Sequence, residues 1–241
     1  MLINLNGLCN FSSRNNRLWH DVTYPLEQIL SAMQISKVIL FVSKTLGALA
    51  ICVFPTIVSA KTILIVGDSL SAGYGIDVKQ GWVNLLQQRL DQQYPKKHKV
   101  VNASVSGETT SGALARMPKL LQTYKPEIVV IELGGNDGLR GQPPQMIQRN
   151  LAQLVQLSQR QKATVLLFGM KIPPNYGTAY STAFEKNYKV VSQQYKVKLL
   201  PFFLEGVAGN KNLIQKDQIH PNAQAQPIML NLAYPYIKGA L

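Results

Sequence analysis

The chain has 241 residues, of which 46% are hydrophobic and 15% are charged, and its formal net charge is +13. This length holds one large domain or two small ones. The basic charge favours anionic surfaces, including phospholipid head groups, but the lysines are scattered apart from Lys96, Lys97 and Lys99. No DNA- or RNA-binding motif accompanies them, so we expect a solvated basic surface in preference to a nucleic-acid partner.

The first 60 residues are interpreted as lying outside the folded domain. Residues 1–32 are polar and aperiodic, and we expect either an unusual extension or a start assigned too early, with translation beginning at Met33. Residues 33–60 have the parts of a secretory signal peptide: two lysines, a short apolar run and a final Val-Ser-Ala. We therefore predict cleavage after Ala60 and a periplasmic or secreted protein.

Two other interpretations of this segment are weaker. An uncleaved membrane anchor needs about 20 apolar residues, whereas Lys44 and Pro55 bracket a shorter run. A lipoprotein site normally has a small residue before its cysteine, and Cys52 follows Ile51. The signal peptide remains the preferred interpretation.

Residues 61–241 are expected to form one domain. These 181 residues carry 21 Lys and Arg against 10 Asp and Glu, a net charge of +11. Cys9 and Cys52 both precede the domain, so it would hold no thiol and no disulfide in an oxidising compartment. Its stability would then depend on the hydrophobic core, for which the length is sufficient.

Short apolar runs alternate with longer helical patterns along this domain. We predict strands at 62–66, 99–103, 127–133, 164–169 and 197–202. We predict helices at about 82–92, 110–123, 144–160, 179–194 and 222–239. This alternation is typical of βαβ units, and continuously hydrophobic strands indicate a parallel sheet covered on both faces. The sequence predicts a three-layer α/β/α domain.

Polar and glycine-rich positions follow the predicted strands. In open α/β sheets, ligands bind at the carboxyl ends of the strands. The residues found there are Asp68 and Ser69 after the first strand, Ser104, Ser106 and Gly107 after the second, and Gly134, Gly135, Asn136 and Asp137 after the third. Asp217 and His220 precede the last helix. We expect the site where these segments meet.

Ser69, His220 and Asp217 have the residue types of a nucleophilic triad. A serine hydroxyl is a poor nucleophile until an adjacent base accepts its proton. His220 is the candidate base, since the domain's other histidine, His98, lies in a lysine-rich approach to a strand. Asp217, three residues earlier, would orient the imidazole and stabilise its charged form. Each residue taken singly is more often a turn, cap or local hydrogen-bonding residue.

Three donors are candidates for an oxyanion hole. They are the backbone N–H of Ser69, the backbone N–H of Gly107 and the side-chain amide of Asn136. A glycine lets the backbone approach a substrate closely. Such donors stabilise the charge that develops on an acyl oxygen.

Four blocks of the sequence carry a resemblance to a known family. They are GDSLSAGYG (67–75), NASVSGETTSG (102–112), ELGGNDGLRG (132–141) and DQIHPN (217–222). Together they resemble the signature blocks of the GDSL or SGNH hydrolases, most closely the bacterial thioesterase, lysophospholipase and arylesterase members. The likeness covers about 62–238, and all five family positions are matched, at Ser69, Gly107, Asn136, Asp217 and His220.

The resemblance implies a flavodoxin-like fold with about five parallel strands, and a serine esterase acting on acyl esters and thioesters without a cofactor or metal. It implies an acyl groove between two loops, with Leu139, Ile172, Pro173 and Tyr176 as candidate substrate contacts. An ordinary proline-stiffened loop is the alternative for the last three. A lysophospholipid substrate and transient contact with a membrane surface are further expectations.

Other functions remain to be weighed. A nucleotide or flavin site would need a glycine where Val78 stands. An α/β-hydrolase elbow would need a glycine where Ser71 stands. A carbohydrate acetyl esterase, or a non-catalytic envelope protein that binds lipids or glycans, would fit the same scaffold. The non-catalytic reading predicts loss of a triad residue, and none is lost.

Overall fold

The computed structural model describes residues 59–241, and the predicted extension and nearly all of the predicted signal peptide lie outside this part. Its centre is a five-stranded sheet in the order β2-β1-β3-β4-β5, with every neighbouring pair parallel. The strands are β1 (Thr62–Gly67), β2 (Lys99–Asn102), β3 (Ile128–Glu132), β4 (Thr164–Phe168) and β5 (Lys198–Leu200). All five predicted strands and their parallel arrangement are confirmed.

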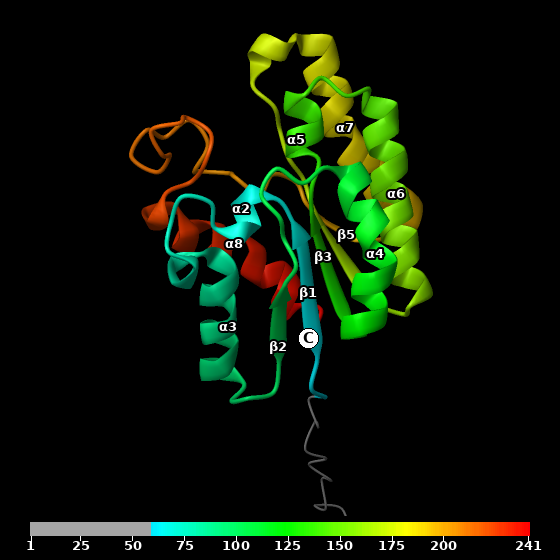
Figure 1. Ribbon diagram of the computed structural model, residues 1–241, viewed down its shortest axis with the longest axis vertical. Coiled ribbons are helices and arrows are strands. Elements are labelled where there is room, and N and C mark those ends of the chain that lie inside the picture. The colour runs from blue at the N-terminus through cyan, green and yellow to red at the C-terminus, as the bar shows by residue number, and fades with distance from the viewer. Residues whose placement is uncertain (1–58) are drawn as a thin grey trace, which may run out of the picture. The chain divides into compact units, whose positions relative to one another are not determined.

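Helices cover both faces of the sheet, as Figure 1 shows. Helices α3 (Trp82–Gln93) and α8 (Gln226–Lys238) pack together on one face, and α4 (Thr110–Tyr124), α6 (Pro144–Arg160) and α7 (Thr178–Tyr195) pack on the other. The three-layer prediction is therefore confirmed.

The central strands are buried because both faces are covered. Ile63 to Val66 in β1 and Ile128 to Ile131 in β3 are all fully buried. The edge strand β2 is only partly buried. A strand without an exposed face needs no polar alternation, which explains the continuous apolar runs in the sequence.

Several short elements were not predicted. Two are α2 (Ser69–Ala72) and α5 (Gly135–Leu139), and the others are single 3₁₀ turns: η1 (Val78–Gln80), η2 (Pro174–Tyr176) and η3 (Ala223–Ala225). The predicted last helix is in fact η3 followed by α8, with Pro227 in the first turn of α8. Elements of three to five residues are too short to show a helical period.

The order of the strands reverses direction between β1 and β3. After β1 the chain moves outward to β2, and it then returns to β3 on the other side of β1. Ligands bind at such switch points, at the carboxyl ends of the strands. Helices α2 and α5 follow β1 and β3 directly, at the upper end of the sheet in Figure 1.

Within residues 59–241, no helix combines the length and the hydropathy needed to cross a bilayer.

Candidate active site

Ser69 is the first residue of α2 and follows β1 after a single residue. Asp68 caps this helix, because its Oδ1 accepts a hydrogen bond of 3.0 Å from the backbone N–H of Leu70. Gly73 ends the helix in the left-handed region (φ 77°). The Ser69 side chain is thereby held at the carboxyl end of β1, where it is little exposed.

Asp217 and His220 lie on one closed loop. The backbone N–H of Gln215 donates to His220 O at 2.7 Å, and Ile214 pairs with Pro221 in an isolated antiparallel bridge. Asp217 Oδ1 accepts from the backbone N–H groups of Ile219 and His220, each at 3.0 Å. These bonds all lie within the loop, so the loop by itself holds the carboxylate beside the imidazole.

The structure brings Ser69, His220 and Asp217 into one hydrogen-bonded row. His220 Nδ1 lies 2.6 Å from Asp217 Oδ2, and His220 Nε2 lies 2.9 Å from Ser69 Oγ. A carboxylate can only accept, so Nδ1 carries the hydrogen and Nε2 accepts from the serine hydroxyl. The hydrogen bonds from the backbone of Ile219 and His220, with that from the His220 ring, lower the pKa of the Asp217 carboxyl to about 2.

Two of the three predicted oxyanion residues, Asn136 and Gly107, differ in their relation to the cavity. Asn136, in α5, lines the same cavity as Ser69 and His220, and its Nδ2 donates to Asp68 Oδ2 at 3.1 Å. Gly107 lies in the loop after β2 with a φ of 78°, and it is not among the cavity-lining residues. Its carbonyl accepts a hydrogen bond of 3.2 Å from Arg140 Nη2.

Two buried carboxyl groups lie beneath the serine. Burial raises the pKa of Asp68 to about 6, against the hydrogen bond from Leu70 and the charge of His220. Burial, and then the charge of Asp68, raise the pKa of Glu132 well above its usual value.

Ser71 Oγ donates to Glu132 Oε2 at 2.7 Å and accepts from Trp82 Nε1 at 3.2 Å. Helix α2 is thus tied to β3 and α3 through Ser71.

A cavity of about 600 Å³ opens beside the row. Of the four predicted substrate contacts, Leu139, Ile172 and Pro173 line it. Tyr176 does not line it and is 37% exposed, but its hydroxyl donates to Leu139 O at 2.9 Å. The other apolar lining residues are Leu70, Met170, Pro174, Phe202, Leu204, Ala208, Ile214 and Ile219. A site of this size and lining suits a hydrocarbon chain.

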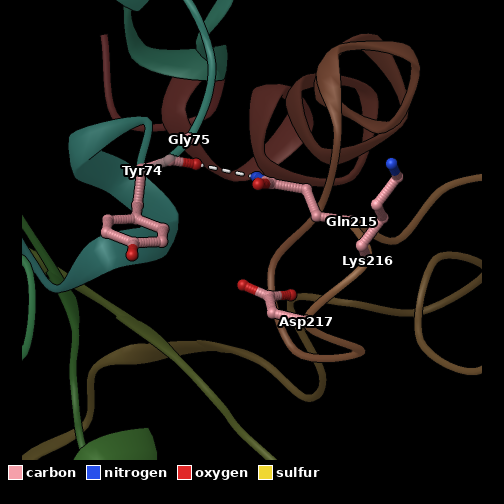
Figure 2. Close-up of a pocket in the computed structure, with 5 residues that line it drawn as sticks. All are labelled: Tyr74, Gly75, Gln215, Lys216 and Asp217. Atoms are coloured by element: carbon pink, nitrogen blue, oxygen red, sulfur yellow. Dashed lines mark hydrogen bonds between the residues drawn. The ribbon is translucent and has the colours of Figure 1, made fainter.

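A second hollow, of about 680 Å³, lies between the segment of Tyr74 and Gly75 and the loop that carries Asp217, as Figure 2 shows. It is lined by Tyr74, Gly75, Gln215, Lys216 and Asp217. The Tyr74 ring also packs on the His220 ring, with 4.5 Å between the centroids. Among residues 59–241, no three His, Cys, Asp or Glu side chains converge on a possible metal position.

Comparison with known proteins gives the family. The model of the GDSL-like lipase/acylhydrolase family matches residues 65–227, which contain every predicted triad and oxyanion residue. The chain belongs to this family. As a GDSL family member, it is an ester hydrolase of the GDSL type.

Several relatives of this GDSL hydrolase have been named or solved. It is 50% identical over 196 residues to esterase TesA of Pseudomonas aeruginosa, covering 81% of this chain and 96% of TesA. It is 44% identical over 171 residues to thioesterase 1/protease 1/lysophospholipase L1 of Escherichia coli, covering 71% of this chain and 80% of that one. A crystal structure of TesA matches with a TM-score of 0.73, 51% identity and coverage of 75% of this chain and 100% of that one.

A psychrotrophic esterase, EstA from Pseudoalteromonas sp., was solved inhibited by monoethylphosphonate. It matches with a TM-score of 0.71 and 45% identity, covering 74% of this chain and 97% of EstA.

Sequence reasoning about this GDSL hydrolase missed several residues around the row. Glu132 stands both in a predicted strand and in a signature block, and neither gives it a role, although an acid inside a buried run is itself a signal. The position of Asp68 after the first strand does not by itself indicate a role, and no sequence pattern distinguishes Tyr74 or Gln215. No local pattern marks Gln215, because its partner Tyr74 lies 141 residues earlier.

Proposed function

We propose that this protein is a serine esterase that hydrolyses acyl esters and thioesters with Ser69, His220 and Asp217. The observation that carries the proposal is the continuous row of short contacts from Asp217 through His220 to Ser69, with Ser69 and His220 lining an apolar cavity. Nucleophile, base and orienting carboxylate stand within hydrogen-bond reach of one another, which is the geometric requirement for this chemistry.

The reaction divides into two steps. Ser69 Oγ attacks the acyl carbon while its proton passes to His220 Nε2, and the same proton then goes to the departing alcohol or thiol. Water next attacks the acyl-serine, giving one proton to His220 and releasing the acid as the serine regains its hydrogen. Asp217, whose pKa is about 2, stays ionised throughout and stabilises the imidazolium.

The oxyanion would be held by the N–H of Ser69, the N–H of Gly107 and the amide of Asn136. One Nδ2 hydrogen of Asn136 is used by Asp68, which leaves the second for the oxyanion in the cavity. Loss of one such donor typically costs about 10²–10³ in kcat.

The substrate class follows from the cavity and the relatives. The apolar lining favours a medium or long acyl chain, and Lys171 at the same cavity suits an anionic head group. Relatives named esterase and thioesterase/lysophospholipase support esters, thioesters and lysophospholipids as candidate substrates, with transient contact at a membrane surface. We expect no nucleic-acid partner.

We also propose export to the periplasm or beyond, with cleavage after Ala60. Support comes from the start of the fold, since β1 begins at Thr62. Removal of residues 1–60 would leave the whole sheet in place. Amino-terminal sequencing of the exported protein tests the position.

The test of function is hydrolysis of p-nitrophenyl esters from acetyl to palmitoyl by residues 61–241, with Ser69→Ala and His220→Ala as controls. We expect turnover with an optimum beyond acetyl, and losses of at least about 10³-fold in both variants. Unchanged turnover in either variant would overturn the triad. An optimum at acetyl would favour a carbohydrate acetyl esterase, and no turnover at any length would favour a binding protein.

A further inference from the structure

The loop that carries Asp217 and His220 is closed on itself. Its base is the pairing of Ile214 with Pro221 and the bond between Gln215 N and His220 O, and its interior is the Asp217 carboxylate bonded to two backbone N–H groups. These contacts fix His220 relative to Asp217. They do not fix either residue relative to Ser69, which lies on a different element.

Two hydrogen bonds join this loop, residues 213–222, to the segment 67–76 that carries the serine. One is the bond between Ser69 and His220 itself. The other runs from Gln215 Nε2 to Tyr74 O at 2.8 Å, and Figure 2 shows it crossing the hollow between the two segments. The same nitrogen donates to Pro221 O at 2.9 Å, next to His220. The Gln215 amide therefore joins the serine segment to the part of the loop next to His220.

The partners determine which way this amide faces. Both acceptors are backbone carbonyls, so the nitrogen of the Gln215 amide must face them. A carboxylate or an apolar group at this position could not make either bond.

The serine segment is shaped to receive Gln215. Gly75 has a φ of 74°, and a Cβ at this position would overlap the Oε1 of Gln215. A side chain at residue 75 would therefore be strained and would also displace the amide. Tyr74, whose carbonyl accepts the bond, packs its ring on His220. The hydrogen bond from Gln215 therefore acts on Tyr74, the residue whose ring contacts the imidazole of His220.

We propose that Gln215 is a positioning residue that sets the distance and direction of His220 from Ser69, through the Tyr74 and Pro221 carbonyls. This inference rests on the proposed function, since it assumes that His220 is the base. Its consequence is kinetic: a general base must stand within hydrogen-bond reach of the proton it removes, and small displacements are costly.

The experiment compares Gln215→Met, which keeps the length but loses both N–H donors, with Lys216→Ala as matched control. Lys216 lies in the same loop, and its side chain extends away from Asp217 in Figure 2. With a p-nitrophenyl ester we expect Gln215→Met to lower kcat by about 10-fold with KM within twofold. We expect Lys216→Ala to retain wild-type kcat. Gly75→Ala, which displaces the amide without altering it, should lower kcat in the same way.

A second comparison separates positioning from general damage to the fold. In a His220→Ala background, residual turnover should be unchanged by adding Gln215→Met, because the group through which Gln215 acts is gone. Wild-type kcat in Gln215→Met overturns the proposal, as does an equal loss in both backgrounds or a rise in KM alone. Full activity of His220→Ala would instead overturn the triad itself.

Discussion

The amide of Asn136 donates a hydrogen bond to the buried carboxylate of Asp68, with 3.1 Å between Nδ2 and Oδ2. The other oxygen of Asp68 caps the helix that carries Ser69. One carboxylate thus fixes the orientation of Asn136 and the start of α2. Because a carboxylate only accepts, it forces the donor end of the Asn136 amide to this side.

Replacing Asp68 with Asn is expected to lower kcat by about 10- to 100-fold while KM stays within threefold. The new amide can still cap α2 through its oxygen, but its NH₂ then faces Asn136. The Asn136 amide is driven to flip, which presents an acceptor where the oxyanion needs a donor. Steady-state kinetics of Asp68→Asn, Asn136→Ala and the double variant test this.

The double variant is the control for that prediction. If Asp68 acts through Asn136, the double variant loses no more activity than Asn136→Ala alone. Multiplied losses would show that Asp68 acts independently of the amide.

The same carboxylate predicts a pH dependence of stability. Burial raises the pKa of Asp68 from 3.8 to about 6, so the folded chain binds a proton at a pH where the unfolded chain does not. The free energy of unfolding contributed by Asp68 therefore increases as the pH falls, and this contribution is lost as pH rises through about 6. From pH 7 to pH 4.5, wild type should gain about 2 kcal/mol relative to Asp68→Asn. Urea unfolding at both pH values measures the gain, and an equal difference at the two would contradict it.

His98 predicts the opposite dependence. Its side chain is buried, and both ring nitrogens lack a hydrogen-bond partner within the described residues. Burial, with Lys61 and Lys97 nearby, lowers the pKa of His98 below 6.5. Below about pH 6.5 the unfolded chain therefore binds more protons at His98 than the folded chain does, so the free energy of unfolding decreases as the pH falls.

Replacing His98 with Phe should remove this loss. Phenylalanine keeps an aromatic ring for the edge contact with Tyr94. We expect His98→Phe to lose less stability than wild type between pH 8 and pH 5.5 in urea unfolding. Parallel curves for the two proteins would show that His98 is protonated equally in both states.

Leu139 is expected to control acyl-chain preference. It lines the cavity, so we expect that shortening it to alanine removes contacts with a long acyl chain but not with an acetyl group. At about 0.8 kcal/mol per buried CH₂, we expect kcat/KM for p-nitrophenyl octanoate to fall about 10-fold relative to p-nitrophenyl acetate. Leu120→Ala, a matched change in α4 outside the cavity, should leave that ratio unchanged. An unchanged ratio in Leu139→Ala would place the acyl chain elsewhere.

Much of the fold could be read from local sequence. Strands β1, β3 and β4 are continuous apolar runs because helices cover both faces of the sheet, and this pattern alone indicated a parallel α/β/α domain. The blocks around Ser69 and His220 stood at strand ends or before the last helix, so the location of the site followed from the fold rule.

Only the tertiary structure decided how these segments meet. Ser69 and His220 are 151 residues apart, Asp68 and Asn136 are 68 apart, and Tyr74 and Gln215 are 141 apart. Local periodicity reports which face of an element is buried, but it carries no information about which distant side chain will stand opposite. That is set when the helical layers pack on the sheet and β1 and β3 become neighbours. The types of the site residues could therefore be predicted from the sequence. The hydrogen bond between Gln215 and Tyr74 and that between Asp68 and Asn136 could not, because they form only when the elements pack together.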